Sequence, residues 1–378
     1  MAIPTKLAHA IKERYGTGEH QLIQDRLDFL LPQIRSAVET DQWVNLHPEY
    51  QRRLVWDNKK KSLFIESLLM NIPIPPVFLF EAELNRYEVM DGQQRLNSIV
   101  EFYDGAFPLI GLDSWSLLNG LRYKQFPEWL KRGLDRRKLS AIVIAAETKP
   151  ATADPDLRRQ VLERLNTGGL HLNAQELRNC LYSREFNELL IELSSSSEFT
   201  SAWSIPPHKY SQLPRGRPSP GLAENEMYRR MKDCEIVLRF FAFREENHIR
   251  GSVRSILDKC MERHKGTSAT QLAEYRSAYI TRLKLARDVF RDEVFRIQDE
   301  GGTWRVSPPL YDGVMVAIDR LWDQRVAIRN AKGQIKEKLA KTLQKPSAYA
   351  LIVGRPNTAQ AIRARLDLLT RVIRSCLR

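Results

Sequence analysis

The segment Asp91–Arg95, with the sequence Asp-Gly-Gln-Gln-Arg, brings a carboxylate, two amides and a guanidinium together in one short stretch. Residues 87–90 before it read as a strand, and the apolar residues after it recur at helical spacing from Leu96 to Tyr103. A strand that turns into a helix at a glycine leaves backbone N–H groups unpaired at the helix start, where the helix dipole also favours anions. The segment is therefore a candidate seat for phosphate.

Each polar side chain of this segment has a role that it can play in nucleotide chemistry. Arg95 can make a bidentate contact with phosphate, and Asp91 can hold a metal ion or a water molecule. Gln93 and Gln94 can orient either of these, while Gly92 lets the backbone approach a ligand. The same residues can equally cap a helix at an ordinary strand–turn–helix junction. Residue chemistry alone leaves both interpretations open.

Two further polar segments are candidates for the walls of the same site. Gln51 and Arg52 lie in a stretch without clear periodicity, residues 47–56, which places aromatic side chains among arginines. Asn166 and Gly168 belong to an Asn-Thr-Gly-Gly loop, where glycine frees the backbone and asparagine supplies hydrogen bonds. The competing interpretations are a surface loop pinned by its aromatic residues and a glycine C-cap.

A basic segment with interleaved aromatic residues runs from Arg122 to Lys138. This composition is typical of surfaces that contact nucleic-acid phosphates and stack on bases. The candidate nucleic-acid-binding residues are Arg132, Arg136, Arg137 and Lys138. A solvated helix with its aromatic side chains in the core is the alternative.

The composition is that of an ordinary globular protein of 378 residues, with 43% hydrophobic and 28% charged residues. A formal net charge of +13 favours a polyanionic partner, because a basic surface binds nucleic acid by releasing counterions. Four scattered cysteines without a Cys-x-x-Cys pair are expected to be reduced thiols. We expect a cytoplasmic protein with no membrane partner, because no stretch resembles a signal peptide or a membrane span.

The chain is expected to have an α+β fold with two domains. A small mixed sheet with helices is predicted in residues 1–200, and an all-α helical domain in residues 201–378. The boundary is placed in the Pro/Arg/Gly-rich stretch 205–221. Periodicity predicts a helix over residues 21–38, and composition predicts strands over 43–46, 77–80, 86–90 and 139–145 and an edge strand over 107–110. The helices predicted in the second half include 227–243, 253–261, 272–297, 311–328, 335–343 and 359–377.

Five motifs in this order resemble one known family. They are Tyr50-Gln51-Arg52 with Val55-Trp56, Ile72-Pro73-Ile74-Pro75, Asp91–Arg95, Leu165–Gly169 and Gln175–Asn179. Together they resemble the N-terminal domain of the GmrSD-type restriction proteins, the domain of unknown function 262. The resemblance extends over roughly residues 20–245, and it is weak or absent beyond them.

The resemblance implies a ParB/sulfiredoxin-like core in which the Asp-Gly-Gln-Gln-Arg turn binds a nucleoside triphosphate, GTP or ATP, and in several members supports its hydrolysis. It implies that Asp91 holds Mg²⁺ or the attacking water, with Gln93, Gln94 and Arg95 as catalytic residues around it. It further implies nucleotide contacts from Gln51, Arg52, Gly92, Asn166 and Gly168. Family members commonly serve in bacterial defence against phage DNA.

One departure from the family bears on function. Two-part members carry a C-terminal nuclease of the His-Asn-His type, whereas the second half here offers only His248 and His264 in helical context. We therefore expect no nuclease in this chain, and a separate nuclease or defence protein as the partner that cuts DNA. The sequence favours an Mg²⁺-dependent NTPase, with a non-hydrolysing DNA-binding adaptor as the alternative. An ATP-dependent reductase is disfavoured, because no cysteine lies near Asp91, and the oligomeric state stays open.

Overall fold

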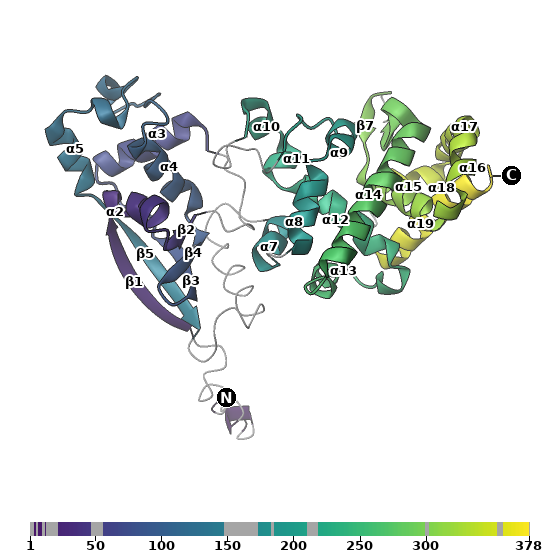
Figure 1. Ribbon diagram of the computed structural model, residues 1–378, viewed down its shortest axis with the longest axis horizontal. Helices are drawn as coiled ribbons and strands as arrows, with labels where there is room; N and C mark the ends of the chain where they lie inside the picture. Colours follow the sequence, from purple (N-terminus) through teal and green to yellow (C-terminus); the bar gives the residue numbers. More distant parts are fainter. Residues whose placement is uncertain are drawn as a thin grey trace. The chain divides into compact units, whose positions relative to one another are not determined.

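A computed structural model describes residues 4, 7–9, 12, 22–46, 56–146, 173–182, 185–209, 218–298, 302–353 and 358–377. The chain divides into two compact units, which are described separately below (Figure 1). Unit 1 is described over residues 22–46 and 56–146, and unit 2 over its residues from Asn173 onward. The described residues from 173 to 200 cluster with unit 2 in this division, and the predicted domain boundary in residues 205–221 stays a prediction.

Unit 1 is built on a mixed five-stranded sheet with the order β1-β5-β3-β4-β2. β1 pairs antiparallel with β5, β5 parallel with β3, β3 antiparallel with β4, and β4 parallel with the short β2. The strands are β1 (Leu22–Leu30), β2 (Val44–Asn45), β3 (Val77–Glu83), β4 (Arg86–Asp91) and β5 (Lys138–Ala146). The four strands predicted over 43–46, 77–80, 86–90 and 139–145 are thereby confirmed, as is the α+β class.

The prediction of a helix over residues 21–38 is wrong for its first half. Residues 22–30 form β1, which pairs along its whole length with β5 from Lys138 to Ala146. Leu27 and Phe29 are half-buried, whereas Arg26 and Asp28, which alternate with them, are exposed, so a period of two underlies the apparent helical spacing. Pairing with β5 therefore decides the conformation, as tertiary context commonly does for short apolar segments. A helix begins only after it, at Leu31.

Helices pack over the sheet to form the core of unit 1 (Figure 1). They are α2 (Leu31–Arg35), η1 (Ser36–Thr40), α3 (Asn58–Leu69), α4 (Gln93–Tyr103), η2 (Ser116–Leu118), η3 (Tyr123–Gln125) and α5 (Glu128–Asp135). The core combines Val77 and Val89 from the strands with Ile65 and Ile99 from α3 and α4. The side chain of Asp57 accepts a hydrogen bond from Lys60 N at 2.8 Å and so begins α3.

The predicted edge strand over residues 107–110 is wrong. This segment is irregular, and its regular contact is a pair of hydrogen bonds with the chain that follows it. Leu109 N donates to Leu121 O at 2.9 Å, and Gly120 N donates to Leu109 O at 2.7 Å. Pro108 has no N–H to extend this pair into a ladder.

Unit 2 is largely helical. Its helices are α7 (Ala174–Leu181), α8 (Glu185–Ser194), α9 (Ser197–Ala202), α10 (Pro220–Glu224), α11 (Glu226–Arg229), α12 (Lys232–Arg244), η8 (Glu246–His248), α13 (Val253–Arg263), α14 (Ala269–Phe290), η9 (Arg291–Glu293), α15 (Pro308–Arg320), η10 (Trp322–Gln324), α16 (Arg325–Asn330), α17 (Lys332–Leu343), α18 (Pro346–Val353) and α19 (Ala359–Arg374). The predicted helices 227–243 and 311–328 are each divided in the structure, the first at Met231, which has φ 53°.

A small hairpin interrupts the helices of unit 2. β6 (Arg296–Gln298) and β7 (Trp304–Val306) pair antiparallel, so the helix predicted over 272–297 ends earlier, at Phe290. Arg291 follows with φ 50° and ψ −127°, values that no helix contains. The second half was predicted to be all-α. Among its described residues, this hairpin is the sheet that departs from that prediction.

The core of unit 2 encloses a cluster of charges. Arg239 on α12, Asp312 on α15 and Arg365 on α19 are buried together. Arg239 donates two hydrogen bonds to the Asp312 carboxylate, and Arg365 Nη1 lies 3.5 Å from Asp312 Oδ2. Cys234, Cys260 and Cys376 are buried free thiols, which agrees with the expected reduced state. The described helices include none that is both long and apolar enough to span a membrane.

Candidate functional site

The turn from β4 into α4 is the strand–glycine–helix junction that the sequence predicts. β4 ends at Asp91, and Gly92 is the N-cap of α4 with φ 97° and ψ 7°, a left-handed conformation. A Cβ atom at Gly92 would collide with the side chain of Val77, which is fully buried on β3. Both the backbone angle and the packing therefore require glycine here. The N–H groups of the first turn of α4 lie directly after this glycine.

Arg95 is held against the backbone beside the turn. Its Nη2 donates to Asp91 Oδ2 at 2.7 Å, and its Nη1 donates to the carbonyl oxygens of Pro75 and Pro76. The Arg95 side chain is only 14% exposed, whereas that of Asp91 is 61% exposed. The guanidinium thus joins the turn to the segment before β3 and orients a carboxylate that faces solvent.

The two glutamines contact main-chain groups. Gln93 is buried, and its Nε2 donates to Leu46 O at 3.0 Å. Gln94 Oε1 accepts a hydrogen bond from Trp56 N at 3.1 Å. These contacts join α4 to the residue after β2 and to the residue before the N-cap of α3. In this structure the amides position the turn, and a role of either one in orienting a ligand stays a prediction.

The electrostatics of the turn follow from unequal burial of the ion pair. Burial lowers the pKa of the Arg95 guanidinium from its usual value, and the neighbouring Asp91 carboxylate opposes that change. Asp91 keeps most of its surface in solvent while one of its oxygens is hydrogen-bonded. The turn therefore combines a helix N-terminus, which attracts anions, with an oriented carboxylate that can accept a cation or a water proton.

The sequence was compared with family models, curated proteins and solved structures. Residues 34–183 match the model described as GmrSD restriction endonuclease, N-terminal domain. This segment is similar to the GmrSD N-terminal domain family. The resemblance drawn from the ordered motifs is thereby confirmed. The comparisons with curated proteins and with solved structures returned no match.

Some predicted residues of the GmrSD N-terminal segment lie outside the described residues. These are Gln51, Arg52, Asn166 and Gly168, so their place relative to Asp91 stays a prediction. The structure brings together Asp91, Gly92 and Arg95 at the turn, and Gln93 and Gln94 in the first turn of α4 contact main-chain groups.

The fifth family motif has a structural role. Gln175–Asn179 lies on α7 in unit 2, where all four polar side chains of the motif are buried. Arg178 Nε donates to Asp258 Oδ1 at 2.8 Å, and its Nη1 donates to Glu235 Oε2 at 3.1 Å. Asn173 and Glu176 form a capping box at the start of α7, because Asn173 Oδ1 accepts from Glu176 N at 3.0 Å and Glu176 Oε2 accepts from Asn173 N at 2.7 Å. This motif attaches α7 to α12 and α13.

The basic segment from Arg122 to Lys138 contains a cation with a structural contact and others that are exposed. Arg137 donates to Leu69 O at 2.9 Å and so fixes the chain between α5 and β5 to the end of α3. Arg132, Arg136 and Lys138 are exposed. Trp129, at 63% exposure, lies three and seven residues before the two arginines and so shares their side of the helical segment. Phe126, in contrast, is buried in the core.

Buried polar residues that the sequence interpretation did not single out surround α4. Glu101 is buried; its Oε2 lies 2.6 Å from Lys61 Nζ, and its Oε1 accepts a hydrogen bond from Asn97 at 2.9 Å. Tyr103 and Tyr123 both donate to Asp135, at 2.7 Å and 2.9 Å to its Oδ1. Glu101 lies four residues after Asn97, a spacing that hinted at their contact.

Among the described residues, the β4–α4 turn lies outside the cavity of unit 1 and has no cluster of metal-ligating side chains. Unit 1 has a cavity of about 510 Å³ beside β2, lined by Trp43 and Tyr87, and Asp91–Arg95 are not among its lining residues. No group of three or more His, Cys, Asp or Glu side chains within the described residues could hold a metal ion. An Mg²⁺ at the turn would accordingly have Asp91 as its described protein ligand. This fits Mg²⁺, which commonly binds through one or two carboxylates and substrate phosphates.

Proposed function

We propose that the protein is the nucleotide-handling component of a GmrSD-type restriction system and that it binds a nucleoside triphosphate at the β4–α4 turn. The observation that carries this proposal is the turn itself, which lies within the matched residues 34–183. Its left-handed Gly92 starts α4, and Arg95 orients the exposed carboxylate of Asp91 beside that helix start. The N–H groups of the first helical turn would contact phosphate oxygens.

The proposed roles of the side chains follow from their contacts. Asp91 would hold Mg²⁺ together with the phosphates, or accept a proton from the attacking water. Arg95 would position Asp91 and, where its hydrogen bonds to Pro75 and Pro76 exchange for phosphate, neutralise the nucleotide. Gln93 and Gln94 would keep the turn in place. Gln51, Arg52, Asn166 and Gly168 would complete the site, as the family resemblance implies.

Phosphate release and nucleotide binding by the purified protein test this proposal. Wild type should bind non-hydrolysable ATP or GTP analogues in titration calorimetry, and it should release phosphate only with Mg²⁺ present. Asp91→Ala should abolish release, whereas Asp113→Ala should not, because Asp113 is an exposed carboxylate outside the turn. Equal background release by wild type and Asp91→Ala with every common triphosphate would refute hydrolysis. Absence of binding would refute the proposal as a whole.

The second candidate is a non-hydrolysing DNA-binding adaptor, and the exposed Trp129 beside Arg132 and Arg136 favours it. In both cases a separate nuclease in the cytoplasm would cut the DNA. Phosphate contacts would make DNA binding fall steeply with salt. A flat salt response, or unchanged affinity in the Arg132→Gln/Arg136→Gln variant, would argue against this candidate.

A further inference from the structure

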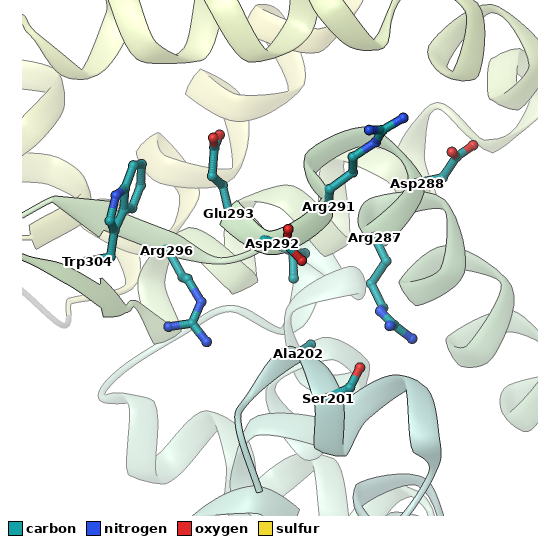
Figure 2. A pocket seen from close by; sticks show the side chains of 10 residues that line it. Ser201, Ala202, Arg287, Asp288, Arg291, Asp292, Glu293, Arg296 and Trp304 are labelled. Carbon is teal, nitrogen blue, oxygen red and sulfur yellow. The ribbon is translucent and has the colours of Figure 1, made fainter.

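Unit 2 contains a cavity of about 870 Å³ that the β4–α4 turn does not share (Figure 2). It lies where α14 ends and the β6–β7 hairpin begins, with Ser201 and Ala202 of α9 on one side. Its volume falls within the range of about 300–1,000 Å³ that small-molecule sites occupy. Arg287, Arg296 and Trp304 project their side chains at its walls in Figure 2.

Two of the acidic residues of this cavity are already neutralised by cations. Asp288 Oδ2 lies 3.0 Å from Arg329 Nε, and its Oδ1 lies 3.7 Å from Lys332 Nζ. Glu293 Oε2 lies 3.1 Å from Lys336 Nζ. Among the described lining residues, Asp292 is therefore the carboxylate left to balance the charge of three arginines, Arg287, Arg291 and Arg296.

The arginines are the groups left to meet a ligand. Within unit 2 as described, neither Arg287 nor Arg291 has a carboxylate within ion-pair distance. Arg287 is half-buried near the end of α14, and Arg291 is exposed. Arg296 Nη2 donates to Ser204 Oγ at 2.8 Å, which fixes one side of its guanidinium and leaves its other donors available. Such a set of guanidinium groups favours an anion with several oxygens.

Trp304 adds a flat apolar surface beside Arg296. In the hairpin, Gln298 pairs with Trp304 and Arg296 pairs with Val306, so Arg296 and Trp304 share one face. Arg305 faces the opposite side. The Trp304 side chain is 46% exposed, although indole is costly to leave in water. An aromatic ring next to a guanidinium is the arrangement with which proteins stack a base and hold its phosphate.

The backbone around the cavity is strained. Arg291, Phe295 and Ser204 have φ values of 50°, 59° and 55°, which side-chain-bearing residues seldom adopt. Phe295 directly precedes Arg296, and Ser204 is the residue that holds it. Strained backbone persists where the surrounding structure enforces it, and it concentrates at ligand sites. The strain therefore supports a binding role for this region.

We propose that this cavity binds a nucleotide unit, with its base on Trp304 and its phosphate on Arg296. Arg287, at the other end of the cavity, takes a second phosphate. Asp292, which lies between the two ends in Figure 2, accepts a hydrogen bond from an amino group of the base. Cytosine carries such an amino group and thymine does not, so we expect cytosine to bind in preference to thymine. The second phosphate comes either from a free nucleoside triphosphate or from the next nucleotide of a single strand.

Fluorescence anisotropy with the full-length protein tests the proposal. The probes are fluorescein-labelled oligodeoxycytidylate and oligodeoxythymidylate of about eight nucleotides, a length within the usual site sizes for single strands. Unlabelled CTP serves as a competitor. Oligodeoxycytidylate should bind more tightly than oligodeoxythymidylate, and Asp292→Asn should reduce this difference. If unlabelled CTP displaces the probe at a lower concentration than unlabelled oligonucleotide does, the ligand is a free nucleotide. If the oligonucleotide displaces the probe at the lower concentration, the ligand is a single strand.

Matched variants separate this site from other cationic surfaces. Arg296→Gln should weaken binding about tenfold or more, because a charge-assisted contact to phosphate is lost. Arg305→Gln removes the same charge from the other face of β7 and should have a much smaller effect. Trp304→Ala should weaken binding, whereas Trp304→Phe should retain it; both are checked by melting temperature. If Trp304→Ala does not fold, the comparison of Arg296→Gln with Arg305→Gln tests the proposed site without it.

Two outcomes would overturn the proposal. One is equal loss of affinity in Arg296→Gln and Arg305→Gln, which would indicate a diffuse charge effect. The other is loss of binding in Trp129→Ala with none in Trp304→Ala, which would place the interface on α5. Asp91→Ala should leave this binding unchanged, so failure here is distinguishable from failure of the triphosphate site at the β4–α4 turn.

Discussion

Replacing Gly92 by alanine tests directly whether the β4–α4 turn depends on its exact backbone. Gly92 has φ 97°, and a Cβ there would collide with Val77. A left-handed conformation costs an alanine about 1–2 kcal/mol. Overpacking a filled core costs about 1–3 kcal/mol more. The reduced entropy of the unfolded chain returns about 0.4–1 kcal/mol. Gly92→Ala should therefore destabilise unit 1 by about 1–5 kcal/mol.

Gly120 supplies a matched control for the collision. Its φ is 87°, close to that of Gly92, but a Cβ added there would meet no atom within 4 Å. Gly120→Ala should cost only the backbone strain, about 1 kcal/mol after the entropy of the unfolded chain is included. The double variant Gly92→Ala/Val77→Ala should recover about 1–3 kcal/mol relative to the sum of its single variants, because the collision is gone.

Hydrogen exchange in increasing urea is the assay, read in peptides of unit 1, because two compact units need not unfold in one transition. Triphosphate binding is measured on the same variants. Equal destabilisation by Gly92→Ala and Gly120→Ala, or no coupling with Val77→Ala, would refute the packing argument. Wild-type triphosphate affinity in a folded Gly92→Ala variant would refute the importance of this turn for binding.

Three further predictions concern groups away from the turn. Asp312→Ala should destabilise unit 2 by about 3–5 kcal/mol, because Arg239 and Arg365 lose their buried counter-charge. Asp323→Ala, at an exposed site, is the control and should change the free energy of unfolding by less than about 0.5 kcal/mol. Urea unfolding measures both variants. Burial and hydrogen bonds to Asp135 raise the pKa values of Tyr103 and Tyr123, so their contribution to stability is present below the ordinary tyrosine pKa of about 10 and is lost as pH rises above it. Unfolding of unit 1 at about pH 8.5 and pH 11 should show this loss, and Tyr103→Phe should reduce it. Burial raises the pKa of Cys260 to about 12, so iodoacetamide should leave this thiol unmodified in the folded protein and alkylate it in urea.

The sequence predicted those strands whose residues are apolar almost without interruption and include aromatic or β-branched side chains, such as Val77–Phe80 and residues 139–145. It failed at β1, where Leu22–Leu30 fits both a helical and an alternating pattern and pairing with β5 decides. It also failed at the β6–β7 hairpin, because each strand is only three residues long, too short to establish a period of two.

The candidate site likewise contains features that the sequence predicted and contacts that it did not. The glycine at the strand-to-helix turn was predictable, because its position between a strand and a helical pattern requires an unusual backbone. The use of Arg95 was not predictable, because the carbonyl oxygens of Pro75 and Pro76 reach it only through the pairing of β3 with β4. The hydrogen bond from Gln93 to Leu46 O was not predictable either, because it joins α4 to the residue after β2, 47 positions earlier in the chain.

The contacts of the motif Gln175–Asn179 indicate which polar residues of the family motifs are structural and which are left to bind a ligand. Its Arg178 is 2% exposed and is shared between Glu235 on α12 and Asp258 on α13, and Asn179 is fully buried. A guanidinium that is buried and already hydrogen-bonded to two half-buried carboxylates presents no solvent-facing group with which to bind phosphate. The polar residues of the family pattern therefore have two kinds of role. Those on α7 hold unit 2 together, and within the described residues Asp91 is the family-motif carboxylate that remains exposed and oriented for a ligand.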